Sequence, residues 1–257
     1  MSVLNLAVEN RVAWVVMSRP EKRNALSVEL IESLTATFLE VNAMEEVRVI
    51  VLRSSDKPFC AGADLHYLTQ LRNNSLEENE ADSQRLRRMF DAIYHSPKLV
   101  ISMVEGPALA GGCGLATLAD VCIASPEATF GYTEVKIGFI PALVMVYLRE
   151  KIGGGVMRDL LLTGKVVTAT EALTMGLVQQ VVDSADILDA MHSVARGCAE
   201  GTSGAAVATV KQMFRELPGL DRDTALDYAA RMNAHARATP DCIKGIDAFL
   251  NKQKLTW

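Results

Sequence analysis

The sequence has no run of about eighteen uncharged apolar residues, the length that predicts a helix crossing a membrane. Its five cysteines are odd in number and show no Cys-x-x-Cys spacing, so neither a disulfide framework nor a zinc site is predicted. Basic residues are not in excess: 26 lysines and arginines stand against 31 aspartates and glutamates, giving a formal net charge of −5. We therefore expect a cytoplasmic protein with reduced thiols, without a metal and without nucleic-acid or membrane partners.

The apolar residues that are present alternate between strand and helix patterns through the first two thirds of the 257-residue chain. Two short β-rich runs, 4–8 and 12–17, predict a hairpin. Ser27 is a candidate N-cap for a helix with apolar residues at helical spacing. Runs that are apolar except for Arg48 and Ser102, typical of strands buried in a parallel sheet, occupy 47–52, 99–104 and 121–124. We therefore predict the α/β class, with a layered core over 1–185.

Strand patterns stop after residue 185. Four helical patterns follow, separated by turn signals, at 187–199, 203–217, 221–238 and 241–252. This composition favours a helical C-terminal region, 186–257, over a second independent domain. The polar, acidic segment 73–84 is predicted to be a solvated loop leading into a surface helix, with a mobile lid over a substrate as the alternative.

Two glycine-containing turns each follow a strand-like run and open a helix. One lies in PFCAGADL (58–65), before a helix that begins near Asp64, and the other lies in LAGGCGLA (109–116). The first N–H groups of a helix have no partner within it, so such a turn is suited to an oxygen that carries negative charge. If the two turns adjoin, one N–H from each would hold a single carbonyl oxygen.

One carboxylate, Glu134, stands in FGYTEVKIGFIP (130–141), between Tyr132 and an apolar run. Apolar surroundings raise the pKa of a carboxyl group toward neutrality, where general acid–base catalysis is most effective. With the two turns, this acid indicates chemistry on a carbonyl compound. The proton transfers of hydration divide easily between two acids, whereas migration of a double bond needs one base only. The residues alone leave these two reactions open.

These segments together resemble the crotonase, or enoyl-CoA hydratase/isomerase, superfamily over nearly the whole chain. The matching motifs stand in the family's order: RPEKRNALS (19–27), CAGADL (60–65), GPALAGGCGLATLAD (106–120), FGYTEVKIGFIP (130–141), LLTGKVVTATEALTMGLVQQVV (161–182) and KGIDAFLNKQKLTW (244–257). The resemblance implies a crotonase-like spiral of ββα repeats, with the helical C-terminal region serving trimerisation and CoA contact. It also implies a coenzyme A thioester as substrate, no separate cofactor, and a homotrimer or homohexamer.

The resemblance also assigns individual positions to the substrate. Glu134 matches the family's acid, and the backbone N–H groups of Ala63 and Gly111 match the two donors to the thioester oxygen. Ala25 and Ala61 are implied to contact CoA through their backbone, and Phe249 is implied to pack beside the nucleotide. Arg23 and Lys252 are implied to bind the CoA phosphates, and Lys252 could come from a neighbouring subunit. Asp64, His66 and Leu143 complete the predicted substrate-binding set.

Three positions depart from the family's pattern. Gly114 stands where many hydratases carry a second glutamate, His66 stands where a basic residue often follows the first turn, and the bulky run 142–145 replaces a glycine-rich one. Similar features occur in family hydratases that act on branched or glutaconyl-type thioesters, namely those that resemble methylglutaconyl-CoA hydratase. We predict a hydratase of a short or branched 2-enoyl-CoA. The alternatives are a 3,2-enoyl-CoA isomerase with Glu134 as its single base, and a catalytically weak CoA-thioester-binding protein.

The space beside Gly114 separates the two enzymatic alternatives. In a hydratase with one carboxylate, we expect that space to hold water or a polar side chain from elsewhere in the chain. In an isomerase, we expect it to be dry and lined by residues of the acyl pocket such as Leu143 and Met145.

Overall fold

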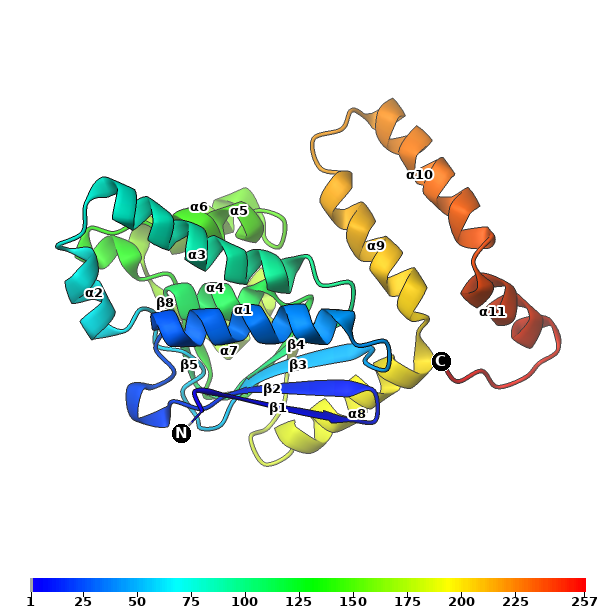
Figure 1. The fold of residues 1–257 in the computed structure, drawn as a ribbon, viewed down its shortest axis with the longest axis horizontal. Helices are drawn as coiled ribbons and strands as arrows, with labels where there is room; N and C mark the ends of the chain where they lie inside the picture. The colour runs from blue at the N-terminus through cyan, green and yellow to red at the C-terminus, as the bar shows by residue number, and fades with distance from the viewer. Residues whose placement is uncertain (1) are drawn as a thin grey trace.

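The computed structural model describes residues 2–257 and shows two sheets surrounded by helices (Figure 1). The larger sheet has the strand order β1-β2-β3-β4-β6-β9. These strands are β1 (Leu4–Glu9), β2 (Val12–Met17), β3 (Val49–Ser54), β4 (Leu99–Val104), β6 (Val121–Ala124) and β9 (Gln180–Val181). β1 and β2 form the predicted antiparallel hairpin, and the other neighbours pair in parallel.

A smaller sheet of order β5-β7-β8 contains β5 (Pro107–Leu109), β7 (Thr129–Gly131) and β8 (Val166–Thr168). β5 and β7 pair in parallel, and an isolated parallel bridge joins Cys60 to Ala108 beside them. Successive stretches of chain thus place one strand in each sheet, β4 then β5 and β6 then β7, before a helical segment follows. This is the predicted ββα repeat, and the predicted α/β class is confirmed.

The helices of the first part of the chain are α1 (Val28–Ala43), α2 (Leu65–Leu71), α3 (Leu76–Tyr94), α4 (Gly111–Leu118), α5 (Ala142–Leu148), α6 (Gly154–Thr163) and α7 (Ala169–Met175), with 3₁₀ turns η1 (Pro20–Lys22) and η2 (Glu134–Ile137). Ser27 caps α1 as predicted, because its side chain accepts from the Leu30 N–H at 3.3 Å. The main core lies between the large sheet and α1, α3 and α4, where Leu34, Phe38 and Phe90 are fully buried.

The C-terminal region divides into two parts. α8 (Ile187–Gly201) covers the other face of the large sheet, where Met191 and Ala195 pack with Trp14, Val51 and Ile101. The helices α9 (Gly204–Glu216), α10 (Arg222–Arg237) and α11 (Pro240–Leu250) then project away as an arm (Figure 1). α11 packs against α9 and α10. The boundary at residues 185 and 186 stays a prediction. In the described part of the chain, no helix has the length and apolar character to cross a membrane.

The segment 73–84 differs from its prediction as a loop, because α3 already begins at Leu76. Ser75 caps this helix: the Glu78 N–H donates to Ser75 Oγ at 3.2 Å, and the Ser75 N–H donates to Glu78 Oε2 at 2.7 Å. A capping box of this kind satisfies two backbone N–H groups at once and starts a helix in a polar segment. The loop prediction was therefore wrong from residue 76 onward.

Candidate active site

The candidate site lies at the carboxyl ends of three neighbouring extended segments. Cys60 bridges in parallel to β5, and β5 pairs in parallel with β7. Neighbouring strands lie about 4.8 Å apart. The backbone leaving these three segments carries Ala63, Gly111 and Glu134 respectively. Parallel pairing therefore brings together three groups that the sequence spreads over positions 63 to 134.

The two glycine-containing turns are in direct contact. The Leu109 N–H donates to the Cys60 carbonyl oxygen at 2.9 Å. A Cβ atom at Gly112 would lie 2.3 Å from the same oxygen, a distance that no side chain tolerates. Gly112 is therefore required for this close approach of the backbones. The turns lie side by side, as the hypothesis of a shared carbonyl oxygen requires.

The backbone of Ala110 has an unusual conformation directly before the Gly111 N–H group. Ala110 has φ 50° and ψ −126°, an unfavourable conformation for a residue with a side chain, and its own N–H donates to the Gly131 carbonyl at 2.7 Å. Gly111 follows as the first residue of α4. Among residues 2–257, neither the Gly111 N–H nor the Ala63 N–H donates a hydrogen bond to the protein. Both donors are available to a ligand oxygen.

Glu134 supplies a buried acid at the third strand end. It is the first residue of η2 and is 8% exposed. Its Oε2 is buried, with no hydrogen-bond partner in the described structure. Burial raises the pKa of the Glu134 carboxyl group. The preceding segment is anchored to α4 by a bond of 2.8 Å between the Tyr132 hydroxyl and Thr117 Oγ1. A buried carboxyl oxygen without a partner is typical of an acid–base group.

The raised pKa should appear in the pH dependence of kcat/KM. A general base acts only when deprotonated, so the midpoint of the acidic limb should lie above the ordinary glutamate value of about 4.3. Stability has the opposite trend, since the folded state holds this proton more tightly than the unfolded state. The free energy of unfolding should therefore fall as the pH rises from the ordinary pKa through the raised one. The Glu134→Gln variant should lack this fall in urea unfolding. If the acidic limb of kcat/KM had its midpoint at the ordinary glutamate pKa, Glu134 would not be the general base.

A hydrogen-bonded loop holds several of the predicted CoA contacts beside the first turn. Arg19 donates to the Ala25 carbonyl at 2.7 Å and to Asp64 Oδ2 at 3.2 Å. Asp64 also caps α2 by accepting from the His66 N–H at 2.9 Å. Burial acts to raise the pKa of Asp64, but the hydrogen bonds from His66 and Arg19 outweigh it and lower that pKa. The Asp64 carboxylate thus orders this loop, and its contact with CoA stays a prediction.

The other predicted contacts fall into two groups. Near the site, the Ala61 N–H donates to the Arg23 carbonyl at 3.1 Å, with the Arg23 side chain exposed, and His66 is exposed on α2. Phe249 is 83% exposed on α11 and Lys252 follows that helix, so the structure places both on the arm, far from α2 in Figure 1. One chain does not bring these two residues to its own site.

The space beside Gly114 is filled by Val144, which sequence reasoning did not identify for this place. A Cβ atom at Gly114 would lie 2.2 Å from Val144 Cγ1 and 3.6 Å from Phe90 Cζ. The surroundings are thus apolar, as expected for the isomerase, but the expected residues do not fill the space. Leu143 is half-buried on α5 and Met145 is 43% exposed.

Asn24, also missed by sequence reasoning, ties the loop to the first turn. It is fully buried, and its Nδ2 donates to Ser54 Oγ at 2.7 Å and to the Phe59 carbonyl at 3.3 Å, while its Oδ1 accepts from the Arg19 N–H at 2.8 Å. Asn24→Ala should lower the free energy of unfolding by about 2–4 kcal/mol, because buried partners lose their bonds. Urea unfolding measures this loss. Asn73→Ala, at an exposed asparagine, should change it by less than about 0.5 kcal/mol; equal losses would contradict the prediction.

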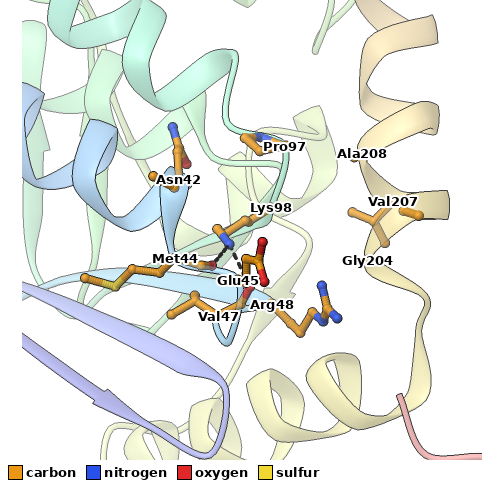
Figure 2. A pocket seen from close by; sticks show the side chains of 12 residues that line it. Asn42, Met44, Glu45, Val47, Arg48, Pro97, Lys98, Gly204, Val207 and Ala208 are labelled. Atoms are coloured by element: carbon orange, nitrogen blue, oxygen red, sulfur yellow. Dashed lines mark hydrogen bonds between the residues drawn. The ribbon is translucent and has the colours of Figure 1, made fainter.

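A separate hollow of about 460 Å³ lies where β3 and β4 begin, beside the start of α9 (Figure 2). Lys98 stands in its wall, but its Nζ donates to the carbonyl oxygens of Met44 and Val47 at 2.5 and 2.7 Å. Burial lowers the pKa of this lysine. The ammonium group is occupied in holding a loop, and the hollow lies at strand beginnings, whereas the three site groups follow strand ends.

Fold and site together define an α/β protein with a spiral of repeats, whose strand ends carry two unpaired N–H groups and a buried acid. A family model described as enoyl-CoA hydratase/isomerase matches residues 7–257, and the chain belongs to this family of enzymes. A Thermus thermophilus protein provisionally named an enoyl-CoA hydratase is 39% identical, with 95% of this chain and 96% of that protein covered.

Two further comparisons agree with this family. The crotonyl-CoA hydratase of Syntrophomonas wolfei is 33% identical, with 97% of this chain and 95% of that protein covered. The crystal structure of an enoyl-CoA hydratase from Shewanella pealeana superposes with a TM-score of 0.94 at 28% identity, covering 99% of this chain and 96% of that one. The predicted family and the crotonase-like fold are confirmed.

Proposed function

We propose that this enzyme hydrates a short or branched 2-enoyl-CoA. The observation that carries the proposal is the unpaired, buried carboxyl oxygen of Glu134 at a strand end beside two unpaired backbone N–H groups, those of Ala63 and Gly111. Relatives that are 39% and 33% identical bear hydratase names, which supports the same reaction. The bulky run 142–145 supports an acyl group of the branched or glutaconyl type.

The geometry suits addition of water with one carboxylate. The thioester oxygen accepts from the Ala63 and Gly111 N–H groups, which draws electrons from the conjugated double bond and makes its β-carbon electrophilic. Glu134 takes a proton from water while the water oxygen bonds to the β-carbon, and an enolate forms. The protonated Glu134 then gives that proton to the α-carbon, so the carboxylate and the thioester carbonyl are both restored. The net change is addition of one water molecule.

The apolar filling beside Gly114 favours a second candidate, a 3,2-enoyl-CoA isomerase. In that reaction Glu134 removes a proton from the α-carbon of a 3-enoyl thioester and returns it to the γ-carbon, and no water takes part. Val144 leaves that side of the site apolar, which this reaction tolerates. The third alternative, a catalytically weak CoA-thioester-binding protein, is disfavoured because the acid and both N–H donors are present together.

Incorporation of oxygen from solvent tests the function. The enzyme in ¹⁸O-labelled water, given straight, branched and glutaconyl-type 2-enoyl thioesters, should produce labelled 3-hydroxyacyl-CoA, detected by mass spectrometry. The Glu134→Gln variant serves as the matched control for the uncatalysed background. Absence of label, together with fast conversion of a 3-enoyl thioester, would reject the hydratase and support the isomerase.

We also propose a homotrimer or homohexamer in which the arm of one subunit contacts another. The arm exposes apolar side chains that a single chain leaves uncovered: Phe214 (69%), Leu226 (58%), Ile246 (50%) and Phe249 (83%). Such a partner arrangement would allow Lys252 and Phe249 to join Arg23 at the CoA of a neighbouring site. Sedimentation velocity measures the number of subunits.

The five cysteines are free thiols, which supports the proposed cytoplasmic location.

A further inference from the structure

The position of Gly114 on α4 decides where a side chain would point. Gly114 lies three residues after Gly111, and residues three apart share one face of a helix. Side chains of a helix also lean toward its N-terminus. A carboxylate at position 114 would therefore lean back along α4 toward its first turn, which carries the Gly111 N–H and where the thioester oxygen is expected. The direction makes this position suitable for an acid, and the obstacle to an acid there must come from outside α4.

That obstacle is Val144, whose Cγ1 lies 2.2 Å from the place of a Cβ atom at Gly114. Val144 is 5% exposed and belongs to α5. α4 and α5 are in direct contact. A side chain at position 114 and the valine at position 144 thus compete for one space.

Two sets of contacts keep α5 in this place. Toward α3, the Tyr147 hydroxyl donates to Asp91 Oδ1 at 2.8 Å, and the Tyr147 ring packs on Tyr94 with centroids 5.0 Å apart. Toward α4, Lys151 Nζ donates to the carbonyl oxygens of Ala119 and Thr117 at 2.6 and 3.0 Å. These contacts hold the C-terminal end of the segment that carries Val144, so α5 cannot move aside without losing partly buried hydrogen bonds.

We propose that Val144 restricts this site to one-carboxylate chemistry by occupying the position of a second acid, and that Gly114 and Val144 form a mutually exclusive pair. This inference rests on the proposed function, because it assigns the acid that a two-carboxylate hydratase would use. Val144 is then a specificity-determining residue: it offers the acyl group an apolar contact on the side where a second carboxylate would otherwise stand.

A double-mutant cycle tests the pair. Gly114→Glu alone should lower the melting temperature by about 5 °C or more, because the core is overpacked. Val144→Gly alone removes the competing side chain and should itself lower the melting temperature, because a buried side chain is lost. In the double variant Gly114→Glu/Val144→Gly, the melting temperature should stay near that of Val144→Gly, so the two losses do not add. Hydration of a straight-chain 2-enoyl-CoA by the double variant should exceed that by Gly114→Glu at least about tenfold.

Met145 provides the matched control, since it is the next residue of α5 and is 43% exposed. In Gly114→Glu/Met145→Gly the two losses of melting temperature should simply add. Additive losses in the Val144 double variant as well would overturn the proposal. Coupled losses without a gain in hydration would also overturn it, because the freed space would then not be an acid position. If the wild-type enzyme incorporates no label from water, the proposed function fails, while the stability coupling, measured without substrate, still supports the Gly114–Val144 pair.

Discussion

The Glu134→Gln variant is expected to turn over substrate at least about a hundredfold more slowly than the wild-type enzyme. Glutamine keeps the size and polarity of the side chain but cannot accept a proton at neutral pH. Such a loss corresponds to about 2.7 kcal/mol of transition-state stabilisation. Because the N–H groups of Ala63 and Gly111 are unchanged, binding of the CoA ester should survive. The measurements are steady-state kcat and the dissociation constant of a product CoA ester.

The control for this prediction is Glu77→Gln, at an exposed carboxylate in the first turn of α3. It makes the same chemical change away from the strand ends and should keep full activity. A folded Glu134→Gln protein with near-normal turnover would remove Glu134 from the mechanism.

Gly111→Pro is expected to lower turnover by about 10²–10³-fold, the usual effect of losing one donor to a developing oxyanion. Proline has no N–H, and the first position of a helix tolerates it because the N–H there has no partner in the helix. Gly111 occupies this first position of α4. The predicted loss therefore combines the missing bond to the substrate oxygen with the strain that proline imposes on the φ 50° and ψ −126° of the preceding Ala110. Turnover and melting temperature are measured together, and an unchanged melting temperature shows that the fold persists.

Gly111→Ala separates the missing donor from the added bulk. Alanine keeps the N–H, and its Cβ would lie 3.0 Å from Leu26 Cδ1, the flexible end of a side chain. Its loss of turnover should therefore be much smaller than that of the proline variant. Equal activities of the two variants would show that the Gly111 N–H does not bind the reacting oxygen.

Features that depend on local sequence could be predicted well. The strands 99–104 and 121–124 lie where their apolar runs place them, and Ser27 caps α1 as its type and position indicate. The glycine-rich turn before α4 was also predicted, because few residues other than glycine allow two backbones to approach so closely. These signals depend on a few neighbouring residues and need no knowledge of the rest of the fold.

Features that depend on contacts between distant residues could not be predicted. Val144 is thirty positions from Gly114, and nothing in the spacing shows that α5 places its side chain in that space. Asn24 is isolated in the sequence, and its burial follows from the packing of its loop against Ser54 and Phe59. The error at 73–84 is different in kind: the capping box at Ser75 was a local signal, but the acidic composition outweighed it in the prediction.

The arrangement of strand ends also bears on how such a site can diverge during evolution. The segment at Cys60, β5 and β7 deliver the three chemical groups through three separate connections, and backbone hydrogen bonds set their alignment. A substitution in one connection can therefore replace one group while the register of the other two is inherited unchanged. Descendants of a common scaffold can acquire a new reaction one turn at a time, without passing through an unfolded intermediate sequence.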